Sequence, residues 1–81
     1  MIGNTELEND DILIFRTSIS EAQDITNVKR LFLQYSQIHK WSVDLEDWEK
    51  VLRIESEGIS VTEVIKALRT INIYASELEY L

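Results

Sequence analysis

Cysteine and proline are absent from this 81-residue sequence, and glycine occurs only twice. Without cysteine the chain forms no disulfide, binds no metal through thiolates and has no cysteine nucleophile. No apolar run exceeds four residues, whereas a membrane-spanning helix needs roughly 20. The first residues show neither the basic region nor the apolar stretch of a secretion signal. We therefore expect a small cytoplasmic domain.

Basic residues are also scarce, with 8 lysines and arginines against 15 acidic residues and a net charge of −7. Proteins that bind nucleic acid or anionic membranes gather lysine and arginine to meet the phosphates. We therefore expect neither nucleic acid nor a membrane as a partner. Four of the acids lie in residues 1–11, which hold no basic residue and no apolar period. This composition predicts a flexible acidic tail at 1–11 and a single domain at 12–81.

Hydrophobic spacing predicts a strand followed by a helix in the first half of the chain. The run Ile12–Phe15 is short and largely β-branched, as in a strand buried on both faces. Ser20 and Gln23 match a capping box, and a helix of about 17 residues is expected to follow them. Its apolar residues recur at steps of three and four, as in an amphipathic helix, and are Ile25, Val28, Leu31, Phe32 and Tyr35.

The second half predicts a hairpin, a second helix and a last strand. Apolar and polar residues alternate over 41–45, which indicates a half-buried strand, and residues 51–54 complete a hairpin with it. Ser60 and Glu63 form a capping box ahead of a second helix, and residues 73–78 read as a strand. The order β-α-β-β-α-β predicts a ferredoxin-like α+β sandwich, with two helices on one face of a four-stranded antiparallel sheet.

Several of these elements also carry the motifs of a known family. Val28 and Phe32 in the first helix, Val43-Asp44-Leu45 in the second strand and the segment 72–75 (Asn-Ile-Tyr-Ala) follow one another at a characteristic spacing. Over residues 18–75 the chain thereby resembles the heavy-metal-associated domain of copper chaperones and metal-transporting ATPases. The resemblance implies the same fold, with the second and fourth strands at the edges of the sheet.

The resemblance places Glu21 and Asp24 where that family has its two metal-binding cysteines. Soft Cu(I) needs thiolate or thioether ligands, so copper transfer is not expected. Carboxylates favour hard cations, but two of them fall short of the about six to eight oxygens of a calcium site. Acids in the first turn of a helix are stabilised by its dipole by about 0.3–1 kcal/mol without any ligand. We expect no metal or cofactor, with weak Mg²⁺- or Ca²⁺-type binding at Glu21 and Asp24 as the alternative.

Trp48 is the residue that points most directly to an interaction. It lies in an acidic turn between the two hairpin strands, and there it either anchors a protein interface or packs against the sheet edge. His39 is the only histidine. No serine or second histidine stands at a catalytic spacing from it, so we expect an exposed loop residue and no enzyme.

These observations favour a non-catalytic domain that acts through protein contacts. An open edge strand can pair with another chain, which makes a homodimer or a strand-adding partner available at the sheet edges. Trp48 is the candidate interface residue.

Overall fold

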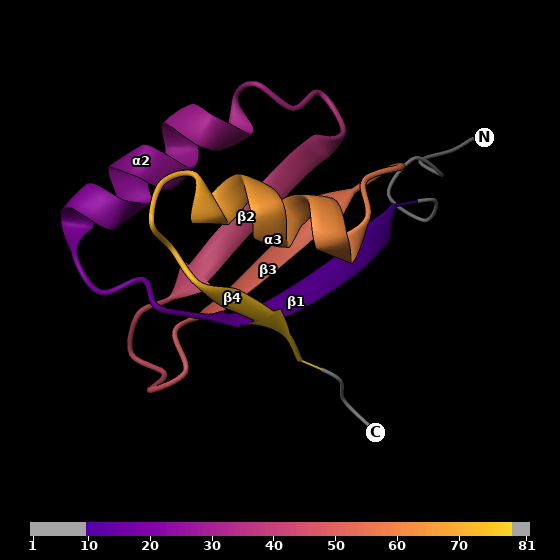
Figure 1. Ribbon diagram of the computed structural model, residues 1–81. Helices are drawn as coiled ribbons and strands as arrows, with labels where there is room; N and C mark the ends of the chain where they lie inside the picture. Colours follow the sequence, from indigo (N-terminus) through magenta and orange to yellow (C-terminus); the bar gives the residue numbers. More distant parts are fainter. Residues whose placement is uncertain (1–9, 79–81) are drawn as a thin grey trace.

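The computed structural model describes residues 10–78, which form six helices and strands (Figure 1). Residues 1–9 of the predicted tail lie outside this range, and Asp11 is already the first residue of a strand. None of the helices in residues 10–78 has the length and apolar character that crossing a membrane requires. In chain order the elements are β1 (Asp11–Thr17), α2 (Ala22–Phe32), β2 (Ile38–Asp44), β3 (Val51–Ser56), α3 (Val61–Arg69) and β4 (Ala75–Glu77).

The strands form one antiparallel sheet in the order β2-β3-β1-β4. Both helices lie on the same face of this sheet (Figure 1). The predicted ferredoxin-like α+β fold is therefore confirmed, and β2 and β4 are the edge strands, as the family resemblance implied.

The two helix starts differ in how well the sequence predicted them. At α3 the predicted capping box is present, because the Glu63 N–H donates to Ser60 Oγ at 3.1 Å and the Ser60 N–H donates to Glu63 Oε1 at 2.9 Å. At α2 the prediction was wrong by one residue. The cap is Glu21, with Asp24 as its third helical residue, because an aspartate at that position accepts backbone N–H bonds that Gln23 was expected to accept.

Helix α2 has 11 residues and is shorter than predicted. After Phe32 the backbone tightens, since the Gln34 N–H bonds to the carbonyl of Leu31 and the Tyr35 N–H to that of Phe32. These bonds span three residues, which is the geometry of a tight final turn. The tightening turns the chain back toward β2, which begins at Ile38.

The hydrophobic core lies between the helices and the inner face of the sheet. It draws on every helix and on the central strands β1 and β3, as well as on connecting segments. Its buried apolar side chains are Phe15, Ile19, Val28, Leu31, Phe32, Leu52, Ile54, Ile59, Val64, Ala67, Leu68 and Ile73.

Candidate functional site

Strand β2 is the longer of the two open edges. It has seven residues and pairs on one side with β3; on its other side no strand among residues 10–78 pairs with it. The opposite edge, β4, has three residues. Because an edge strand presents unpaired backbone N–H and C=O groups, β2 offers a longer surface for pairing with another chain.

The two faces of β2 differ in character. Trp41 and Val43 pack against the core and are half-buried, whereas Lys40, Ser42 and Asp44 are exposed. The Trp41 ring meets the ring of Phe32 edge to face, with centroids 5.5 Å apart and planes at 89°. This contact fixes β2 to α2 and leaves the polar residues of the strand on the other face.

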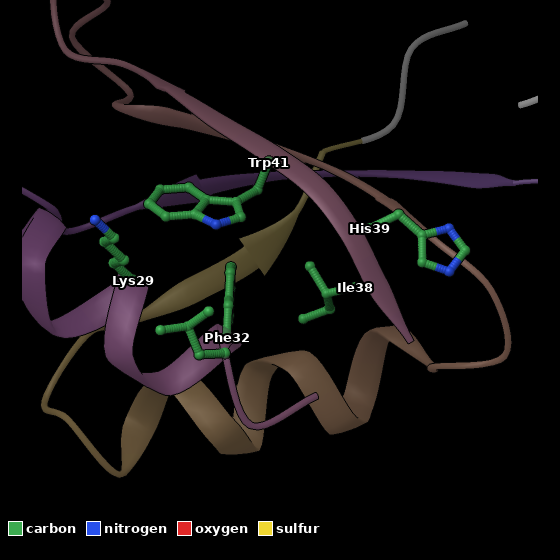
Figure 2. Close-up of a pocket in the computed structure, with 6 residues that line it drawn as sticks. Lys29, Phe32, Ile38, His39 and Trp41 are labelled. Carbon is green, nitrogen blue, oxygen red and sulfur yellow. The ribbon is translucent and has the colours of Figure 1, made fainter. Parts of the chain in front are cut away.

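An apolar groove runs along this edge, between α2 and β2. Figure 2 shows Phe32 reaching into it from the helix and Trp41 from the strand, with Lys29 at one end. His39 extends away from the two rings. Leu33 also lines the groove and is 78% exposed. Apolar surface is therefore available beside the unpaired edge of β2.

Trp48 lies in the turn between β2 and β3 and is 83% exposed, more than any other large apolar side chain among residues 10–78. Of the two alternatives for this residue, packing against the sheet edge is excluded. An indole left almost wholly in water is a typical anchor of protein interfaces. Its role in binding stays a prediction.

The backbone of this turn is fixed by local hydrogen bonds. Asp44 Oδ1 accepts from the Glu46 N–H at 3.1 Å, and Asp47 Oδ1 accepts from the Glu49 N–H at 2.7 Å. Lys50 Nζ donates to the carbonyl of Leu45 at 2.8 Å. The turn therefore holds Trp48 in a defined place beside the end of β2, and two of its acids serve the turn itself.

Glu21 and Asp24 lie together at the start of α2, as predicted. Asp24 Oδ2 accepts from the backbone N–H of Ser20 at 2.9 Å, from the backbone N–H of Glu21 at 3.2 Å and from the Ser20 hydroxyl at 3.4 Å. A cation at Asp24 Oδ2 would have to replace three donors. The geometry therefore favours helix capping, and weak hard-cation binding at Glu21 and Asp24 stays an untested alternative.

The same hydrogen bonds predict a pH-dependent contribution to stability. The backbone N–H of Ser20 lowers the pKa of Asp24 below its ordinary value of 3.8, against an opposing effect of burial, and the Glu21 N–H and Ser20 hydroxyl lower it further. A carboxyl with a depressed native pKa stabilises the fold above its unfolded pKa and loses this effect as pH falls through the native value. We expect Asp24→Ala to unfold at lower urea concentration than the wild type at pH 7, with a smaller difference at an acid pH below the ordinary aspartate pKa of 3.8. An equal difference at both pH values would contradict this role.

His39 does not occupy the exposed loop that the sequence predicted. It lies within β2, at a register shift between the pairs Ile38–Ser56 and Lys40–Glu55, so it is the extra residue of a β-bulge. Its Nδ1 lies 3.1 Å from Asp10 Oδ2. The prediction failed because the apolar alternation begins only at Trp41, two residues after the bulge.

Comparisons with known proteins place the chain by its fold. No protein-family model matches the sequence, and no curated protein matches it. Among solved structures, the solution structure of the N-terminal domain of ZntA in its apo form is similar, with a TM-score of 0.69 and 12% sequence identity over 86% of this chain and 94% of that one. At this identity the likeness shows the fold alone.

Proposed function

We propose that this chain is a non-catalytic protein-contact domain of the cytoplasm and that its β2 edge, together with the Trp48 turn, binds a second copy of the same chain. One observation carries the proposal: a seven-residue edge strand is bordered by an apolar groove and by a tryptophan that is 83% exposed. Strand addition at such an edge gains main-chain hydrogen bonds, and neighbouring apolar side chains add affinity.

The charges on β2 favour a second copy over an arbitrary strand. Lys40 and Asp44 are both exposed and lie two residues on either side of Ser42. If two copies of β2 pair antiparallel about Ser42, Lys40 of each copy stands opposite Asp44 of the other. Opposite charges directly across an antiparallel pair stabilise it by about 0.2–1 kcal/mol each. The strand is thus self-complementary, which a two-fold symmetric interface requires.

The same register also matches the apolar face of the strand. It places Trp41 opposite Val43 of the second copy, and both side chains are half-buried in the single chain. The groove beside β2 would meet its symmetry mate across the new pair of strands. A lysine on an edge strand normally discourages pairing, and here it instead selects the one register in which Asp44 neutralises it.

Measuring mass against concentration tests this proposal. We expect sedimentation equilibrium of the full chain to show a monomer at low concentration and a mass approaching twice that value as the concentration rises. Trp48→Ala is expected to weaken the association several-fold, because interface tryptophans often contribute 1 kcal/mol or more, about a fivefold change in affinity. Tyr74→Ala is the control, since Tyr74 is exposed but lies beside β4.

A wild-type mass that stays monomeric up to millimolar concentration would refute the dimer. So would equal weakening by Trp48→Ala and Tyr74→Ala, because β4 would then contribute as much as the proposed edge. Unfolding curves of both variants establish that the fold is intact, since exposed substitutions usually change stability by less than about 0.5 kcal/mol.

A further inference from the structure

Three segments far apart in the sequence meet at one end of the sheet. Ser56, the last residue of β3, pairs with Asp11 of β1 on one side and with Ile38 of β2 on the other. Asp10 and Glu57 are the next residues outward on β1 and β3, and His39, the extra residue of the bulge just inside the start of β2, lies beside them. This end is opposite to the end where β1 leads into the loop that carries Glu21 and Asp24.

The side chains of Asp10, His39 and Glu57 bring oxygen and nitrogen atoms together. One ligand atom from each residue lies within 4.8 Å of the other two. His39 Nδ1 lies 3.1 Å from both carboxylate oxygens of Asp10. In a tetrahedral zinc site with bonds of about 2.0–2.1 Å, neighbouring ligand atoms are about 3.3 Å apart. The Asp10–His39 spacing is close to this value, and the exposed Glu57 has a ligand oxygen within 4.8 Å of both.

The backbone holds these three residues in place. The β-bulge re-aims the side chain of His39 relative to the regular alternation of β2, which is a common use of bulges at functional sites. The Glu57 N–H donates to the carbonyl of Gln37 at 2.9 Å and so fixes Glu57 beside the start of β2. Asp10 and Glu57 directly adjoin the paired ends of β1 and β3, and His39 lies within β2, so the backbone already brings the three residues together.

The charges at this end of the sheet favour a cation. The Asp10 side chain is only 4% exposed. A second carboxylate, that of Glu57, lies close by. A carboxylate withdrawn from water is costly unless a positive charge compensates it, and a dication compensates two carboxylates at once. His39 Nδ1 already faces the Asp10 carboxylate, and a bound ion would take the place of the proton between them.

From this geometry we infer that Asp10, His39 and Glu57 form a binding site for a divalent transition-metal ion of the Zn²⁺ type, completed by water. One imidazole nitrogen and two carboxylates suit Zn²⁺, whereas sites for Mg²⁺ and Ca²⁺ are built from oxygen alone. Three protein ligands leave at least one coordination position to solvent. Through His39 the site shares strand β2 with the proposed dimer, but it uses none of residues 40–44, which set the dimer register, and it lies apart from the loop at Glu21 and Asp24.

Titration of the full chain with Zn²⁺ tests this site. Calorimetry measures the affinity and the number of ions bound, and NMR shows which residues respond. Because His39 is the only histidine, its imidazole signals are unambiguous. We expect one Zn²⁺ per chain, with shifts at His39 and at the amides of Asp10 and Glu57. Glu57→Gln and His39→Gln should each weaken binding at least tenfold, since loss of one ligand in three removes about 1.4 kcal/mol or more.

Glu77→Gln is the matched control, because it removes one acid from the opposite edge strand and should leave Zn²⁺ affinity unchanged. Glu57 is exposed, whereas Asp10 is partly buried, so the Glu57 variant keeps the test valid even if changes at Asp10 disturb folding. The site is refuted if His39 signals do not move at millimolar Zn²⁺, if Glu57→Gln binds as the wild type does, or if Mg²⁺ binds as tightly as Zn²⁺. A mass that doubles only with Zn²⁺ would likewise overturn a site within one chain, whereas failure of the metal-free dimer leaves this test unaffected.

Discussion

Lys40→Glu and Asp44→Lys are each expected to weaken self-association of the chain by roughly tenfold when tested alone, and an equimolar mixture of the two is expected to associate again. In the symmetric register about Ser42, either substitution turns two attractive pairs into two repulsive ones. A change of about 0.7 kcal/mol at each pair gives this factor. In the mixed dimer every charge again faces its opposite.

Sedimentation of each variant and of the mixture measures these three affinities directly. Asp44 also accepts a hydrogen bond from the Glu46 N–H, so an unfolding curve for Asp44→Lys is needed beside it. The proposed register is contradicted if each variant dimerises as the wild type does. It is equally contradicted if the mixture remains as weak as its components, because this register places every charge of the mixed pair opposite its counterpart.

The largest expected effect on stability comes from Leu68→Ala. Leu68 is 0% exposed and lies on α3 in the centre of the core. Its truncation removes apolar contacts and leaves a cavity, which costs about 2–5 kcal/mol of unfolding free energy. In a chain of 81 residues, whose total stability is expected to be only about 5–10 kcal/mol, such a loss is a large share.

Leu33→Ala provides the matched comparison, because it is the same substitution at a leucine that is 78% exposed. Urea unfolding of both variants should place Leu33→Ala within about 0.5 kcal/mol of the wild type. Similar losses for the two leucines would mean that the core is not where the structure places it.

Local sequence signals predicted the fold well where a single element carried them. The capping box of Ser60 and Glu63 lies where expected, because both partners are close in sequence and the apolar period starts directly after them. The length of α2 was overestimated because Tyr35 and Ile38 continue the pattern of burial. Both pack against the core, but from a turn and a strand, so periodic burial extended beyond the helical backbone.

The last strand was also predicted too long. Strand β4 covers only residues 75–77. Asn72 has a φ of 63°, which turns the chain sharply after α3, and Ile73 is then buried in the core rather than paired in the sheet. The two-residue spacing of Ile73 and Ala75 therefore does not mark a single strand. Ile73 is buried in the core, whereas Ala75 lies in β4.

The candidate sites show what one sequence can and cannot predict. Trp48 was recognised because an aromatic residue in an acidic turn stands out locally, although only the structure distinguished exposure from packing. Asp10, His39 and Glu57 were not recognised as a group, because they lie on three separate strands. Their proximity depends on the register of β1 and β2 against β3, and the bulge at His39 has no local sequence signal.

The measurement that tests the β2 interface most directly is a two-dimensional amide NMR spectrum of the full chain at low and at tenfold higher concentration. Self-association through β2 predicts shifts and broadening at residues 40–44 and at Trp48, with β4 unchanged. Spectra that superimpose at both concentrations, or changes confined to β4 and Tyr74, would contradict it.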